Sequence, residues 1–139
     1  MTRRSYFGPH ITVTFDGSRC LHAAECVRGL PEVFDTKRKP WISPQAGAAE
    51  EIARVVRRCP AGALEYGPGQ QDFGATPEEP SVPTQVKATP DGPLWVRGAV
   101  EVMTERGPDH LNRVALCRCG QTENKPFCDA SGDCTGWRG

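Results

Sequence analysis

The sequence predicts an α+β protein built from two small domains joined by a linker. Three observations support this prediction: one strong helical pattern between two strand patterns, then a Pro- and Gly-rich stretch without periodicity, then two further strand patterns. With 13 prolines and 15 glycines in 139 residues, long stretches must be loop. The predicted parts are a first α/β domain at residues 1–67, the linker at 68–92 and a small β-rich domain at 93–139.

The strand predictions rest on short runs that alternate or are rich in β-branched residues. "HITVTFDG" alternates and ends in Asp-Gly, which indicates a strand that runs into a turn, and "GALEYG" predicts the closing strand of the first domain. In the second half, "PLWVRGAVEVM" and "NRVALCRC" predict two strands joined by the polar loop "TERGPDHL". The last of these strands leads directly into a pair of cysteines.

The helical pattern is "SPQAGAAEEIARVVRRCP", residues 43–60. Ser43 is placed to cap the helix and Pro44 suits the first helical position. Apolar side chains follow at i, i+3, i+4 and i+7, ending with Cys59 on the buried face, and Pro60 stops the helix. The pattern therefore predicts one continuous helix that delivers a cysteine at its end.

Composition and charge exclude several classes of function. Seventeen basic residues balance seventeen acidic ones, which argues against a nucleic-acid binder that neutralises phosphates. No stretch approaches the apolar length of a membrane span, and no apolar signal core follows the two N-terminal arginines, so we expect a cytoplasmic protein. The absence of a phosphate-binding glycine loop and of a nucleophile elbow predicts that the protein is not an enzyme.

Seven cysteines is a high number for a chain of this size. An odd number without an export signal favours reduced thiols and metal ligation over a disulfide framework. Burial as small apolar side chains explains one or two of them, but not close pairs next to Pro, Asp and Gly. We therefore expect metal binding at two sites.

The first set consists of Cys20, Cys26 and Cys59. Cys20 and Cys26 stand at the outer positions of a C-x2-C-x2-C triplet whose middle position is Ala23, and Cys59 is followed by Pro60. Three such thiolates can hold a [3Fe–4S] cluster, or a [4Fe–4S] cluster with a ligand other than cysteine. Zinc is the competing metal, although the C-x5-C gap suits tetrahedral zinc poorly.

The segment around this set resembles divergent single-cluster ferredoxin-like domains. "GLPEVFD" matches an element that often follows the cysteines in that family, and the resemblance covers about residues 10–67. It implies a ferredoxin-like α/β fold for the first domain. His22, between the two cysteines, is either a fourth ligand or a histidine that bonds a backbone carbonyl in the cluster loop.

The second set lies in "CRCGQTENKPFCDAS", which resembles the CDGSH (mitoNEET-like) iron–sulfur motif. The resemblance implies a [2Fe–2S] cluster with Cys117 and Cys119 on one iron and Cys128 on the other. Ala130 replaces the motif's glycine, and Gly132 stands where the family has its histidine ligand. A structural four-cysteine zinc site is the competing prediction.

The fourth ligand of this second site is therefore open. Cys134 is the favoured substitute because thiolate is the strongest of the available ligands for an iron–sulfur cluster. Asp133, His110, a histidine of a second chain or solvent are the alternatives. A cysteine here would give a lower reduction potential than a histidine, because thiolate is anionic and imidazole is neutral.

Together these features predict a protein that transfers single electrons with two clusters per chain. The alternatives are a module that stores, senses or delivers a cluster, and a structural zinc protein that mediates interactions. The expected partners are a redox reductase or acceptor, and the CDGSH resemblance implies a homodimer. "TKRKP" and Arg57–Arg58 are either a docking surface for an acidic redox partner or an ordinary solvated face.

Overall fold

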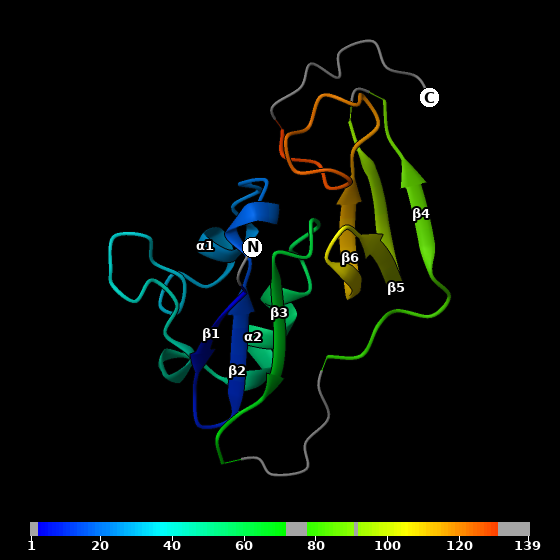
Figure 1. The fold of residues 1–139 in the computed structure, drawn as a ribbon. Helices are drawn as coiled ribbons and strands as arrows, with labels where there is room; N and C mark the ends of the chain where they lie inside the picture. Colours follow the sequence, from blue (N-terminus) through cyan, green and yellow to red (C-terminus); the bar gives the residue numbers. More distant parts are fainter. Residues whose placement is uncertain (1–2, 72–77, 91, 131–139) are drawn as a thin grey trace. The chain divides into compact units, whose positions relative to one another are not determined.

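The structure is a computed structural model that describes residues 3–71, 78–90 and 92–130. It consists mostly of sheet, with two three-stranded antiparallel sheets and two short α-helices in the described residues (Figure 1). The chain divides into two compact units. The N-terminal unit comprises Met1–Gly17, His22–Cys59 and Ala63–Glu78, and the C-terminal unit comprises Ser18–Leu21, Pro60–Gly62 and Glu79–Gly139.

The N-terminal unit contains one sheet of strand order β1-β2-β3. The strands are β1 (Arg4–Phe7), β2 (Ile11–Phe15) and β3 (Leu64–Pro68). The two strands predicted in this part of the sequence are thereby confirmed as β2 and β3. Strand β1 was not predicted, because its residues are mostly exposed and show no alternation of apolar and polar side chains.

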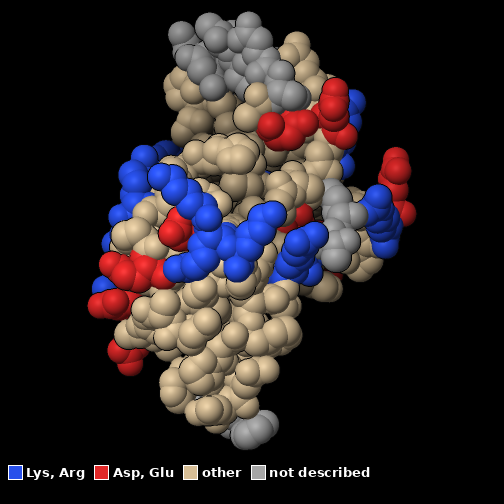
Figure 2. All heavy atoms as spheres, turned by 90° about the vertical axis from the view of Figure 1, so that its left-hand side faces the viewer, with Lys and Arg blue, Asp and Glu red and all other residues tan. Residues whose placement is uncertain are grey.

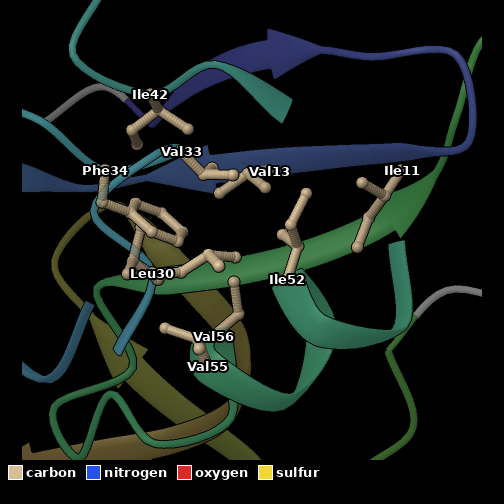
Figure 3. Packing of buried hydrophobic residues seen from close by; sticks show 10 residues of the cluster. Ile11, Val13, Leu30, Val33, Phe34, Ile42, Ile52, Val55 and Val56 are labelled. Atoms are coloured by element: carbon tan, nitrogen blue, oxygen red, sulfur yellow. The ribbon is translucent and has the colours of Figure 1, made fainter. Parts of the chain in front are cut away.

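The helix α2 (Ala49–Val56) packs against β2 and β3, and the 3-10 turn η2 (Pro44–Ala46) packs against β2. The short helix α1 (Glu25–Gly29) packs against α2. Figure 3 shows apolar side chains from α2, from β2 and from the segment around Val33 pointing toward one another. Ile52 and Val56 are fully buried in this core, as the i, i+3, i+4 pattern predicts, and Val13 of β2 is fully buried with them.

The predicted continuous helix at 43–60 is wrong in its first half. The backbone at Gly47 is extended, so the segment splits into the turn η2 and the helix α2, and Ser43 makes no side-chain capping bond. A tight tertiary contact at Gly47 accompanies the break in the helix. A Cβ on Gly47 would lie 2.8 Å from Val33 Cγ2, so this position has no room for a side chain. The α-helix ends at Val56, and hydrogen-bonded turns carry the chain on to Cys59.

The C-terminal unit contains a second sheet of strand order β4-β5-β6. The strands are β4 (Gln85–Ala88), β5 (Leu94–Thr104) and β6 (Gly107–Leu116), and the unit also includes the last two residues of the 3-10 turn η1 (Gly17–Arg19). The two predicted strands are confirmed as β5 and β6. The predicted linker contains β4, whose four residues are all exposed, so only its backbone pairing with β5 marks it as a strand.

The hairpin between β5 and β6 is tighter than predicted. Most of the predicted loop "TERGPDHL" belongs to β6, because the chain turns within Thr104–Gly107. The Thr104 hydroxyl donates to the Gly107 carbonyl at 2.8 Å and accepts from the Arg106 N–H at 3.2 Å. These bonds close the turn early, so β6 runs unbroken into the second cysteine set.

None of the helices in the described part of the chain has the length and apolar character that a membrane crossing requires. The six cysteines within that part form no disulfide.

Candidate metal centres

The second cysteine set lies where β6 ends and the chain folds back on itself. Leu116 and Phe127 form an antiparallel bridge, flanked by hydrogen bonds of 2.9 Å from Cys117 N–H to the Pro126 carbonyl and from Cys128 N–H to the Ala115 carbonyl. In such a pairing, side chains next to a bridge point to the opposite face from the bridge residues. Phe127 is buried, so Cys117 and Cys128 lie on the other face, on the same side of the ribbon.

Cys117 and Cys119 form a pair suited to one metal atom. Two sulfurs bonded at about 2.3 Å to a tetrahedral metal lie roughly 3.8 Å apart. The two Sγ atoms are 3.8 Å apart in the structure, and both side chains are half-buried. No three His, Cys, Asp or Glu side chains within 3–71, 78–90 and 92–130 are grouped to hold a metal ion. A two-iron cluster takes its protein ligands as two pairs, and this C-x-C pair fits one iron of such a cluster.

The loop around these cysteines is held by its own polar groups. The Thr122 hydroxyl donates to the Phe127 carbonyl at 2.7 Å and accepts from the Asn124 N–H at 3.1 Å. The Asp129 carboxylate accepts from the Glu123 N–H at 2.9 Å. These bonds hold the loop that spans the second set, and a metal bound at both of its ends would restrain it further. Sequence reasoning missed Thr122, since a single threonine in a polar loop carries no local signal.

Backbone donors also act on the sulfur atoms. The Gly120 N–H donates to Cys117 Sγ at 3.3 Å. Burial by itself would raise the pKa of the Cys117 thiol. Hydrogen bonds to its sulfur outweigh this effect, so the pKa of Cys117 is lowered. The donors are the backbone N–H groups of Thr122, Gly120 and Cys119 and the Cys119 thiol. Burial raises the pKa of Cys128, and the negative charges of Cys117, Asp129 and Cys119 raise it further.

These opposite shifts predict an order of reaction in the metal-free protein. Iodoacetamide should modify Cys117 at a lower pH than Cys128, because only the thiolate is nucleophilic and the lowered pKa supplies it earlier as pH rises. Mass spectrometry of the alkylated peptides over a pH series measures both profiles. Coincident profiles, or Cys128 reacting first, would contradict the prediction.

Of the remaining positions of the second motif, the structure describes Ala130 but not the residues after it. Ala130 has a φ of 62°, in the left-handed region that glycine adopts without strain, so the replaced motif glycine sits where a side chain is costly. Gly132, Asp133 and Cys134 lie outside the described residues.

His110 is placed far from this set. It lies on β6 opposite Glu101, with His110 Nδ1 3.5 Å from Glu101 Oε2. Six residues of strand at about 3.3 Å each put it roughly 20 Å from Leu116. His110 of the same chain is therefore too distant to complete the site.

The first cysteine set is distributed over three segments. Cys26 lies on α1 and Cys59 follows the turn after α2, and both pack against the core of the N-terminal unit. Cys20 follows the 3-10 turn η1 and belongs to the C-terminal unit. His22 is exposed and left-handed, with a φ of 57°, as is Ala24 at 63°. Two such residues, separated only by Ala23, give the segment between Cys20 and Cys26 a strained backbone, a feature often found at functional sites.

The comparisons with known proteins match both cysteine-bearing parts of the chain. A family described as a divergent 4Fe-4S mono-cluster matches residues 6–68, and a family described as an iron-binding zinc finger of the CDGSH type matches residues 91–131. The chain is 43% identical over 63 residues to the uncharacterized protein YjdI of Escherichia coli K12, covering 45% of this chain and 83% of that protein. YjdI of Escherichia coli O157:H7 matches equally well. No solved structure is significantly similar to the chain.

These matches define a metal-cluster protein with one iron–sulfur domain and one iron-binding domain. The chain belongs to the divergent 4Fe-4S mono-cluster family through residues 6–68, and it carries a CDGSH-type domain at residues 91–131.

Proposed function

We propose that this protein is a one-electron carrier with two iron–sulfur clusters per chain and no catalytic residues of its own. The first site would use Cys20, Cys26 and Cys59 for a [3Fe–4S] or [4Fe–4S] cluster in a ferredoxin-like domain. The second would use Cys117, Cys119 and Cys128 for a [2Fe–2S] cluster, with Cys134 as its fourth ligand. When bound, such clusters supply one-electron redox chemistry.

The observation that carries this proposal is the Cys117–Cys119 pair with its N–H donors. The 3.8 Å separation of the two sulfurs suits one iron, and the Gly120 N–H points at a sulfur. Such N–H donors stabilise negative charge on sulfur and so favour the reduced form of a bound cluster. The half-buried position of the cysteines keeps part of the site away from water while leaving an edge accessible.

A basic surface near the first set suggests the kind of partner. Figure 2 shows Lys and Arg side chains gathered on one face of the molecule. Arg28, Arg57 and Arg58 are exposed, close in sequence to Cys26 and Cys59, and a Cβ on Gly29 would lie 3.8 Å from an Arg58 guanidinium nitrogen. This surface suits an acidic redox protein, whose encounter rate the charges would raise. We also propose a cytoplasmic homodimer that binds no nucleic acid.

The experiment that tests this function is EPR of the protein purified without air, with iron and sulfide analysis and a redox titration. Wild type should give two signals with reversible midpoint potentials, one lost in Cys59→Ser and the other in Cys117→Ser. Cys134→Ser should shift or abolish the second signal if Cys134 is the fourth ligand. A preparation that holds zinc, or that passes its cluster to an apo-acceptor without a reversible potential, would overturn the electron-carrier proposal.

A further inference from the structure

Arg19 is a buried arginine immediately before a cysteine of the first set. Arg19 is the last residue of the turn η1 and is 2% exposed. Its guanidinium carbon lies 5.5 Å from the centroid of the Phe127 ring. Phe127 is itself 1% exposed and directly precedes Cys128 of the second set. A buried guanidinium needs strong compensating contacts, and the face of an aromatic ring supplies one.

A hydrogen bond beside this contact joins the same two segments. The Asn124 Nδ2 donates to the Ser18 carbonyl at 3.0 Å. Asn124 is in turn fixed by Thr122, whose hydroxyl also holds the Phe127 carbonyl. A connected set of contacts therefore runs from the loop of the second cysteine set to the segment that carries Cys20. All of these residues belong to the C-terminal unit.

The segment after Cys59 also belongs to this unit. Pro60–Gly62 is grouped with it, and Gly62 lies so close to the Arg113 carbonyl that a Cβ there would be 1.8 Å from the oxygen. Cys20 of the first set therefore lies within the C-terminal unit, which also carries the second set. Cys59 directly precedes a segment of that unit.

We propose that these contacts couple the two metal sites, so that an occupied second site slows loss of iron from the first. A metal held by Cys117 and Cys128 orders the loop between them. The ordered loop holds Ser18–Leu21 through Asn124 and Phe127, so less conformational entropy is lost when Cys20 binds its metal. Linkage makes the coupling reciprocal: a metal at the first site strengthens binding at the second. This inference rests on the proposed metal sites but not on their use in electron transfer.

A double-mutant cycle on the full chain tests the coupling. Wild type, Cys117→Ser, Arg19→Ala and the double variant are loaded with iron and sulfide and then exposed to a chelator. The readout is the rate at which the EPR signal assigned to the first site by Cys59→Ser disappears. With Arg19 intact, Cys117→Ser should speed this loss about tenfold. A tenfold change corresponds to the free energy of a desolvated cation–π contact together with its neighbouring hydrogen bond. In the Arg19→Ala background it should add little.

Two controls keep the result specific. Arg19→Lys retains the charge but not the planar stack, so it should uncouple the sites in part, whereas Arg106→Ala at the hairpin turn should leave the coupling intact. Hydrogen exchange of the backbone amides of Ser18–Leu21 gives a second readout, which should quicken in metal-loaded Asn124→Ala.

Equal acceleration by Cys117→Ser in both Arg19 backgrounds would overturn the proposal, as would unchanged exchange in Asn124→Ala. A wild-type protein that binds no iron would instead overturn the proposed function, so the two failures are distinguishable.

Discussion

Gly62→Ala is expected to lower the free energy of unfolding by roughly 3 kcal/mol or more. Gly62 has a φ of 70°, where an alanine costs about 1–2 kcal/mol. The added Cβ would also lie 1.8 Å from the Arg113 carbonyl oxygen and 2.7 Å from its carbon. Both contacts are with backbone of β6, which cannot rotate away as a side chain can, so the strands must shift. Chemical denaturation followed by circular dichroism measures the loss.

Gly107→Ala is the matched control for this prediction. Gly107 also has a positive φ, of 111°, but a Cβ there meets nothing within 4 Å. Its substitution therefore carries only the conformational cost of a positive φ, about 1–3 kcal/mol. Equal destabilisation by the two variants would show that the close approach of Gly62 to β6 contributes nothing.

Cys117→Ser is expected to reduce iron at the second site from full occupancy to less than about a tenth. A serine hydroxyl is not ionised near neutral pH, and Cys117 is the thiol that the backbone N–H groups prepare as a thiolate. The other thiol of the pair, Cys119, would be left without its neighbour 3.8 Å away. Iron and sulfide analysis after anaerobic reconstitution with excess iron gives the occupancy.

Cys59→Ser is the reciprocal control, since it removes a thiol of the first set only. Under the same reconstitution it should remove iron from the first site and leave the second site filled. If Cys117→Ser instead keeps its second-site signal at wild-type intensity, Cys117 is not a ligand.

The two families could be predicted from sequence because cysteine spacing is a local property of a chain. Cys20 with Cys26, and Cys117 with Cys119, fall within a few residues of each other, so a short window contains the pattern. The buried strands and α2 were predictable for the same reason, since alternation and the 3.6-residue period mark a buried face. The outer parts of the sheets were not, because β1 and β4 bury little side-chain surface.

Other features depend on residues distant in sequence, and no local pattern indicates them. The helix break at Gly47 follows from the approach of Val33, and the placement of Ser18–Leu21 with the C-terminal unit follows from contacts with Asn124 and Phe127. Arg19 looks like a surface residue in the sequence, yet it is among the most buried polar residues described. Long-range packing overrides local preference at each of these positions.

The contact between Ser18 and Asn124 also has a consequence for biosynthesis. The two residues are 106 positions apart, and a ribosome adds about 5–20 residues per second. Ser18–Leu21 is therefore made roughly 5 to 20 seconds before the asparagine that holds it. During that interval Cys20 has emerged, or is emerging, without its supporting loop. If the chain holds the proposed clusters, iron loaded early in translation would meet an incomplete first cysteine set, which favours cluster insertion after the chain is released.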